Sequence, residues 1–208
     1  MILYVETNFV LELAFLQEDH EHCEEIIELA EGRAGGLQLV IPAFSVGEAY
    51  HRQIRQEAER SALQGRIINA LDDISRTRPY AERSMELREV TSFLEESNRE
   101  DRGRLDSVLK TLLSAAGVIP TTGAVIAEAF DLQRSRGLSP PDALVYASVL
   151  SHLRSAAPQG AQGAQASCFV TRDRHFADDD IRADLEALGC KLLFKFEDAQ
   201  GYVRSRLT

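Results

Sequence analysis

Four acidic side chains stand where predicted elements join, and together they could form an oxygen-rich metal site. Glu6 follows the apolar run at residues 2–5, and Asp173 follows the apolar start of SCFVTRD. Glu48 opens a predicted helix in PAFSVGEAY, and Asp142 opens another in SPPDALVYA. Carboxylate oxygens are the ligands that hard cations such as Mg²⁺ and Mn²⁺ prefer. Four carboxylates held close together repel one another unless they share protons or metal ions.

Three of these acids also fit simpler structural roles. The segments SVGE (45–48) and SPPD (139–142) both match helix capping boxes, the second with proline at the first helical position. Asp173 could accept backbone N–H bonds in a turn. Glu6 is harder to explain in this way, because it directly follows a buried strand. Capping and metal binding are compatible, since a capping acid still has an oxygen to offer.

Apolar strands alternate with amphipathic helices along the chain, and these elements must position the acids. Apolar runs predict strands at residues 2–5, 37–42, 117–122, 167–173 and 190–196. Helical periodicity predicts helices at residues 8–30, 45–76, 80–116, 123–137 and 139–156. We expect Thr7 or Asn8 to cap the first helix, and a break near Gly103.

This alternation predicts an α/β fold, a three-layer α/β/α sandwich with a mainly parallel central sheet. We expect residues 1–208 to form a single domain with a helical insertion at about 55–116 and a flexible Ala/Gln/Gly-rich loop at about 155–166. In such folds, sites form outside the carboxyl ends of the strands, where Glu6 and Asp173 fall.

Composition limits the function classes. The net charge of −10 does not attract nucleic acid by its overall field, so a nucleic-acid enzyme would need metal ions or a local basic patch. The chain has no apolar run long enough to span a membrane, and its N-terminus lacks the basic region of a signal peptide, so we expect a cytoplasmic protein. Three widely spaced cysteines predict buried free thiols.

The order of the motifs resembles the PIN-domain family of metal-dependent nucleases. The matching segments are the first strand with Glu-Thr-Asn, then S-V-G-E on a helix, then G-L-S-P-P-D-A-L-V-Y-A, and last C-F-V-T-R-D-R-H-F. The resemblance implies an acidic pocket formed by the four acids and holding one or two Mg²⁺ or Mn²⁺ ions. It implies an RNA substrate. Many prokaryotic members are toxins that pair with an antitoxin protein, and such toxins often form homodimers.

Two further residues carry over from the resemblance, and three features depart from it. Asn8 matches the polar residue after the family's first acid, and Thr171 matches the hydroxyl near the last acid. The first acid is Glu6 where the family normally has Asp, which shifts the carboxylate by more than ~1 Å, and misplacement on that scale can cost about 10²-fold in rate. His175 stands where the family often has an acid, and we interpret it as a surface residue. The helical segment 55–116 exceeds what a minimal PIN domain needs.

The sequence therefore favours an Mg²⁺- or Mn²⁺-dependent endoribonuclease that hydrolyses RNA phosphodiester bonds, with a role as a toxin as one form of that function. The alternative is a catalytically inactive PIN-like module that binds RNA or a protein partner, favoured by Glu6 and by the acidic charge. A metal-dependent phosphatase would need an aspartate nucleophile in a D-x-D pattern after the first strand, which this sequence lacks. A purely structural protein, whose acids are only caps, also remains open.

Overall fold

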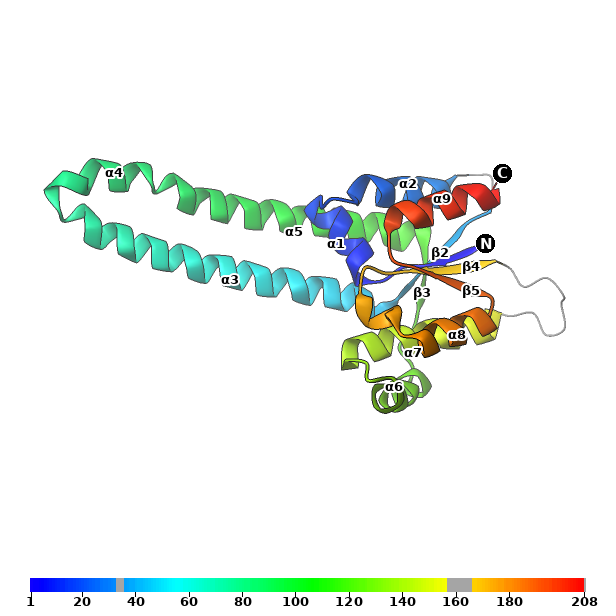
Figure 1. Cartoon of the computed structure of the whole chain (residues 1–208). Helices are drawn as coiled ribbons and strands as arrows, with labels where there is room; N and C mark the ends of the chain where they lie inside the picture. Colours follow the sequence, from blue (N-terminus) through cyan, green and yellow to red (C-terminus); the bar gives the residue numbers. More distant parts are fainter. Residues whose placement is uncertain (33–35, 157–165, 208) are drawn as a thin grey trace. The chain divides into compact units, whose positions relative to one another are not determined.

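The chain folds into two compact units. The computed structural model describes residues 1–32, 36–156 and 166–207. Unit 1 comprises Met1–Ala49 and Val108–Thr208, and unit 2 comprises Tyr50–Ser107. Figure 1 shows the elements in chain order. We propose that unit 2 is an insertion within one domain, because unit 1 is assembled from the chain segments on both sides of it.

The described elements of unit 1, apart from the two helices that it shares with unit 2, are β1 (Ile2–Tyr4), α1 (Thr7–Phe15), α2 (His20–Glu31), β2 (Gln38–Pro42), β3 (Ala116–Ile119), α6 (Gly123–Arg136), α7 (Pro140–Ala156), β4 (Ser167–Val170), the 3₁₀ helix η2 (Arg174–Ala177), α8 (Asp179–Ala187), β5 (Cys190–Leu193) and α9 (Phe196–Leu207). The elements that lie in unit 2, wholly or in part, are α3 (Ala43–Ser75), the 3₁₀ helix η1 (Arg78–Tyr80), α4 (Ala81–Glu86) and α5 (Glu89–Ala115).

A parallel sheet forms the centre of unit 1. Its strand order within the described residues is β3-β2-β1-β4-β5, and every pairing is parallel. Tyr4 of β1 lies opposite Val40 of β2 on one side and Phe169 of β4 on the other. The chain adds β2 and β3 on one side of β1 and then β4 and β5 on the other, so the order reverses between β1 and β4. In open parallel sheets, the crevice at such a reversal is the usual ligand site.

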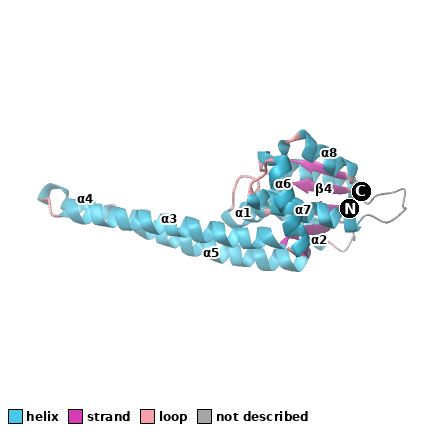
Figure 2. Cartoon of the chain, turned by 90° about the horizontal axis from the view of Figure 1, so that it is seen from below, coloured by secondary structure: helices cyan, strands magenta, loops and turns pink. Residues whose placement is uncertain are grey.

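Helices cover both faces of the sheet, as the three-layer prediction required (Figures 1 and 2). On one face, α6, α7 and α8 pack over a core that includes Tyr4, Phe169 and Tyr146 of α7. On the other face lie α1, α2 and α9, where the rings of Phe9 and Phe196 meet edge to face with centroids 5.6 Å apart. Because both faces are buried, the strands read as continuous apolar runs in the sequence.

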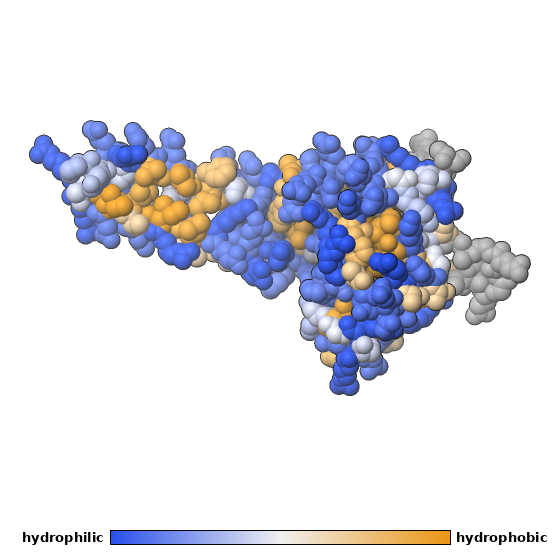
Figure 3. Space-filling view, viewed as in Figure 1, coloured by the Kyte–Doolittle hydropathy of each residue, from blue (hydrophilic) through white to orange (hydrophobic). Residues whose placement is uncertain are grey.

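Unit 2 is a helical hairpin whose two arms are joined in part by polar contacts. The α3 arm and the α4–α5 arm run side by side (Figures 1 and 2). Arg60 donates to the Asp101 carboxylate at 2.6 Å, and the Gln64 amide donates to the Thr91 carbonyl at 3.0 Å. Apolar side chains also gather along the middle of the hairpin face seen in Figure 3, and Phe93 is 66% exposed.

Several predicted boundaries were wrong. The helix expected at 8–30 is two helices, because Leu16 adopts a left-handed backbone with φ of 48° and ends α1. The helix expected at 80–116 is divided into α4 and α5 at Leu87 and Arg88, and the break expected near Gly103 does not occur, because α5 continues through it. The chain also forms α8 and α9, which the periodicity did not predict.

Two further expectations concern the loop and the thiols. The flexible loop predicted at 155–166 lies mostly outside the described residues, which stop at Ala156 and resume at Ala166. Cys23, Cys168 and Cys190 are buried free thiols, as predicted. Within the described ranges, none of the helices combines the length and the apolar content that crossing a membrane requires.

Candidate metal centre

Glu6 lies at the carboxyl end of β1, at the point where the strand order reverses. It is the N-cap of α1, and its Oε2 accepts a hydrogen bond from the Asn8 backbone N–H at 2.9 Å. The predicted caps, Thr7 and Asn8, are therefore wrong, because both are already helical residues. Extending the register of Tyr4 with Phe169 by two residues places Glu6 opposite Thr171, so strand pairing brings the ends of β1 and β4 together.

The Glu6 carboxylate is buried and only partly satisfied. The residue is 5% exposed, and its Oε1 is inaccessible and makes no hydrogen bond to a described residue. The pKa of Glu6 is raised to about 7, because burial raises it more than hydrogen bonds with Asn8 and Thr171 lower it, and the negative charge of Glu48 adds a small further rise. An unsatisfied buried charge of this kind is costly, so the site favours a proton or a cation at Oε1.

Glu48 approaches Glu6 from the first turns of α3. The capping box proposed for Ser45 and Glu48 does not form, because α3 begins at Ala43, directly after β2, and Ser45 is buried inside the helix. The Glu48 carboxylate instead accepts a hydrogen bond from the hydroxyl of Thr7. This contact between α1 and α3 orients Glu48 beside the end of β1.

Asp142 occupies the first turn of α7, and Ser139 caps that helix as its sequence indicated. The Asp142 backbone N–H donates to Ser139 Oγ at 3.4 Å, and the Ser139 hydroxyl donates to Asp142 Oδ2 at 2.6 Å. Partial burial raises the pKa of Asp142, the Ser139 hydrogen bond lowers it, the Asp173 charge raises it and His175 lowers it. Asp142 is therefore both the hydrogen-bond partner of the helix cap Ser139 and a neighbour of Asp173.

Asp173 follows β4 and caps the 3₁₀ helix η2. Its Oδ1 accepts a hydrogen bond from the His175 backbone N–H at 2.8 Å, which is the turn role considered for it. Its own backbone N–H donates to Thr171 Oγ1 at 2.9 Å. Thr171 is fully buried and lowers the pKa of Glu6, so its hydroxyl lies near the end of β1 as well as beside the acid after β4.

His175 is the residue whose participation the sequence interpretation missed. Its side chain is 74% exposed, yet its Nδ1 lies 3.0 Å from Asp173 Oδ1 and 3.6 Å from Asp142 Oδ2. The three residues offer ligand atoms that all lie within 4.8 Å of one another, so this group could hold a metal ion. The available signal was its position two residues after Asp173, where the family often has an acid.

The structure arranges the four predicted acids as two linked pairs. Glu6 and Glu48 interact electrostatically, and so do Asp142 and Asp173. Among the described residues, the set of ligand atoms within 4.8 Å includes the second pair with His175 and neither of the two glutamates. The oxygen-rich donors suit Mg²⁺ or Mn²⁺, and the imidazole suits Mn²⁺ better than Mg²⁺.

Arg172 lies between Thr171 and Asp173 but is already paired. Its guanidinium binds Glu12, whose side chain is 1% exposed, and Asp19 lies 3.9 Å away. This ion pair fixes the loop after β4 to α1. Arg172 is therefore a structural cation of the site, and a role in holding phosphate would require it to leave a buried carboxylate uncompensated.

The fold and the site define an α/β protein with an acidic centre at the switch point of a parallel sheet. A sequence model of the PIN domain matches residues 3–176, and the chain belongs to the PIN-domain family. A search of the curated proteins finds no match. Among solved structures, the chain is similar to one from the "Crystal structure of VapBC2 from Rickettsia felis bound to a DNA fragment from their promoter", with 15% identity, a TM-score of 0.45, and coverage of 92% of this chain and 97% of that chain.

Proposed function

We propose that this protein is an Mg²⁺- or Mn²⁺-dependent endoribonuclease that hydrolyses RNA phosphodiester bonds. The observation that carries the proposal is the Asp142, Asp173 and His175 group, connected through Thr171 to the buried Glu6 carboxylate with its unpartnered oxygen. Membership of a family of metal-dependent nucleases supports it. A metal ion at this site would activate water and stabilise the charge that develops on the phosphate.

Each residue of the site has a proposed task. Glu6, Glu48, Asp142 and Asp173 are the catalytic acids that hold one or two ions, and His175 is a further ligand. Asn8 positions the Glu6 carboxylate through its backbone N–H, and the Thr171 hydroxyl favours the ionised form of that carboxylate. Thr7 orients Glu48 in the same way, and Ser139 orients Asp142. Fixed ligands lose little freedom when the ion binds, which favours a defined site over a diffuse acidic surface.

The biological setting extends the same proposal. We propose a cytoplasmic protein that acts on RNA as the toxin of a toxin–antitoxin pair, with an antitoxin protein as its partner and a homodimer as its assembly. Family membership supports this setting, since many prokaryotic PIN proteins have it. Coexpression with the neighbouring reading frame in its genome, followed by size-exclusion chromatography of the complex, tests it.

The alternative is an inactive PIN-like module that binds RNA or a protein partner. One observation favours it: in the longer Glu6 side chain, Oε2 caps α1 and Oε1 is completely buried. The Glu6→Asp variant separates the two functions, because it restores the family's usual acid. Cleavage by the wild type supports the enzyme. Cleavage by Glu6→Asp alone supports a module that lost activity through this substitution.

Calorimetric titration with Mn²⁺ is the first test of the metal centre. We expect the wild type to bind Mn²⁺ saturably. We expect Asp142→Asn to lose both Mn²⁺ binding and RNA cleavage. Asp131→Asn is the matched control, because Asp131 is an exposed acid of α6 outside the site and its loss changes the net charge equally. Cleavage retained by Asp142→Asn would contradict the assignment of the site.

A further inference from the structure

The cations of unit 1 fall into two groups, those paired with carboxylates and those without such a partner. Arg136, Arg154 and Arg172 each contact acidic side chains. Within the part of the chain that the structure describes, four cations that line one surface cavity make no ion pair, although the chain is rich in acids. They are Arg174, Arg182, Lys191 and Lys195.

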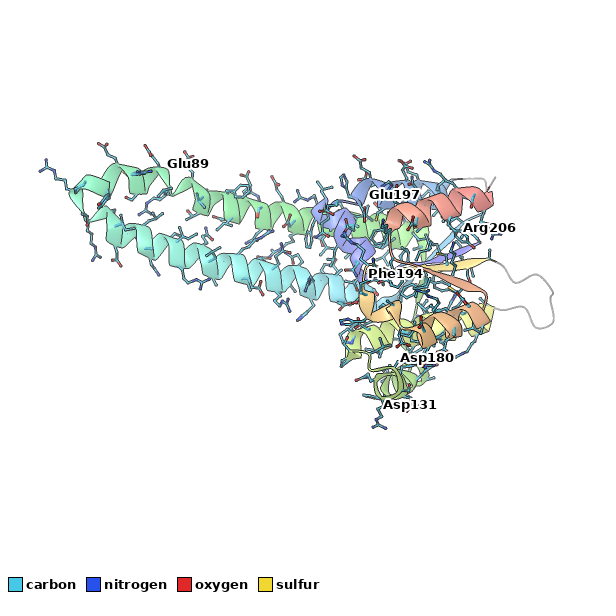
Figure 4. All side chains as sticks on the ribbon, viewed as in Figure 1. Glu89, Asp131, Asp180, Phe194, Glu197 and Arg206 are labelled. Carbon is cyan, nitrogen blue, oxygen red and sulfur yellow. The ribbon has the colours of Figure 1, made fainter. Side chains whose placement is uncertain are left out.

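This cavity, which we call the β5 groove, has a volume of about 440 Å³ and lies along the last strand of the sheet. Arg182 comes from α8, Arg174 from η2, and the two lysines from β5 and the residues that follow it. Phe194, labelled in Figure 4 between β5 and α9, contributes apolar surface. Three consecutive elements and the residues after them therefore direct their cations into one groove.

Two of the cations are held by aromatic rings instead of by acids. The Arg174 guanidinium lies 4.8 Å from the centroid of the Phe194 ring, and Lys191 Nζ lies 4.7 Å from that of Tyr202. Contacts with ring faces keep a cation in place without neutralising it. The charges of these side chains thus remain available to an anion.

The groove is positive although the chain is acidic. Its four cations face two acids, Glu186 and Asp198, which leaves a charge of +2. The rest of a chain with net charge −10 therefore carries −12. Lysine on the outer strand of a sheet can serve simply to prevent strand pairing. That role explains Lys191, but it does not explain why α8 and η2 add arginines to the same groove.

The groove begins beside the candidate metal centre. Arg174 directly follows Asp173 in the sequence. The Thr171 backbone N–H donates to the Leu193 carbonyl at 3.0 Å, which joins the end of β4 to the end of β5. A polyanion bound along the groove would therefore reach the metal centre at the Arg174 end.

We propose that the β5 groove binds the phosphate backbone of single-stranded RNA next to the metal centre. This proposal rests on the proposed ribonuclease function and identifies where the strand lies. Cationic grooves that follow the backbone, with aromatic surface in them, are the usual means by which proteins bind single strands without reading sequence. The groove supplies the local basic patch that an acidic nuclease needs.

Binding of a fluorescein-labelled 20-nucleotide oligouridylate, followed by fluorescence anisotropy in EDTA, tests the proposal without hydrolysis. We expect the double variant Lys191→Glu/Lys195→Glu to bind at least about 10-fold more weakly. Losing two phosphate contacts should also reduce the slope of log K against log salt by about 1.4. The matched control is Lys110→Glu/Arg134→Glu, which changes the net charge equally at two exposed cations outside the groove and should retain the wild-type slope.

If the glutamate variants fail to fold, the same binding measurements are made with glutamine at the same positions. Equal weakening in the groove variant and in the control would overturn the proposal, and so would absence of RNA binding by the wild type at 50 mM salt. Preference of the groove for poly-glutamate over RNA would assign it to an acidic protein partner and would also overturn it. If the wild type binds RNA through the groove but does not cleave it in Mn²⁺, only the proposed nuclease function is rejected. If the wild type cleaves RNA and the groove variant binds RNA as tightly as the wild type, only the proposed role of the groove is rejected.

Discussion

Unit 1 and unit 2 are stabilised by different interactions, although helices dominate both. In unit 1, aromatic and aliphatic side chains from both sheet faces fill an apolar interior, with Tyr4, Phe9 and Phe169 fully buried. In unit 2, charged and polar groups join the two arms, and the polar side chains Gln53 and Asp101 are buried. Unit 2 also leaves large apolar side chains in solvent (Figure 3).

The difference implies two responses to perturbation. Apolar burial stabilises in proportion to the area removed from water and does not depend on salt at ordinary concentrations. Half-buried ion pairs stabilise less and are weakened by salt. A two-helix hairpin joined in part by half-buried ion pairs should therefore open at lower free energy than the sheet of unit 1. Amide hydrogen exchange reports on each unit separately and can therefore measure the free energy of opening of each.

The largest expected effect is that of Phe169→Ala in unit 1. Phe169 is fully buried, and its ring packs edge to face on Phe176 with centroids 5.4 Å apart. Removing the ring leaves a cavity between β4 and the helices below it, so the free energy of unfolding should fall by about 3–5 kcal/mol. Chemical denaturation monitored by circular dichroism measures the loss. A loss below about 1 kcal/mol would contradict the account of unit 1 as the apolar unit.

The second effect concerns the charged group inside the apolar unit. With no metal present, Glu6 is neutral in the folded protein up to its raised pKa of about 7, whereas the unfolded chain ionises from 4.5. Folding therefore takes up a proton between these values, so stability falls as pH rises through this window, by about 3 kcal/mol in total. Below pH 4.5 the ionisation of Glu6 does not lower the stability of the fold, and above pH 7 the full loss of stability is present.

Glu6→Gln removes this titration. We expect the variant to be more stable than the wild type at pH 8 in EDTA and to have a flatter profile between pH 5 and pH 8. Added Mn²⁺ should restore stability to the wild type at pH 8, since a cation compensates the buried carboxylate, and should do little for the variant. Identical pH profiles for the two proteins would contradict the burial of an ionisable Glu6.

The sequence predicted the parts of unit 1 that rest on apolar continuity. Runs such as residues 2–5 and 167–173 identified strands, and their alternation with helices identified the fold, because buried parallel strands must be apolar on both faces. It also identified the acids at the strand ends. The hydrogen bonds that position them, from Thr7 to Glu48 and from the Asp173 backbone to Thr171, depend on strand register and on the start of α3. No local pattern encodes these features.

The sequence predicted less where short-range motifs compete. SVGE looks like a helix start, but the helix had already begun at Ala43, so tertiary packing overrode the motif. Leu16 ends α1 in a left-handed backbone conformation, which a leucine in the sequence gives no reason to predict. His175 joins Asp142 and Asp173 because η2 turns it back, and an exposed histidine offers no sign of this.

A smaller effect is expected from the ion pairs inside unit 2. Asp101, with an 11% exposed side chain, accepts hydrogen bonds from Arg60 and Arg104, so Asp101→Asn leaves two cations without their partner. We expect a local loss of about 2 kcal/mol, seen as roughly 30-fold faster amide exchange in residues 50–107. High salt should reduce the difference in exchange rates between Asp101→Asn and the wild type, because it screens the ion pairs of the wild type.

Asp73→Asn is the control for the ion pair. Asp73 pairs with Arg76 at 3.8 Å, but both side chains are about four-fifths exposed, 78% and 81%. Its loss should change the exchange rates of unit 2 by less than a factor of about 3, because exposed pairs contribute little. Equal effects of the two variants would mean that the buried charges do not stabilise the hairpin.

The smallest effects, of opposite sign in the two units, come from two glycines. Gly65 lies inside α3, and a Cβ there would meet open space, so Gly65→Ala should stabilise unit 2 by about 0.5–1 kcal/mol through helix propensity. Gly137 ends α6 with φ of +66°, so Gly137→Ala should destabilise unit 1 by about 1 kcal/mol, because alanine is strained in that conformation.

Peptide-resolved hydrogen exchange separates these two glycine effects. Slower exchange in residues 50–107 of Gly65→Ala, with no change in the sheet, would show that the hairpin opens independently of unit 1. A matching change in the strands would mean that the two units unfold together, and the contrast between an apolar and a polar unit would then describe their contacts but not their cooperativity. Gly137→Ala provides the reciprocal measurement, since its effect should appear in α6 and the sheet first.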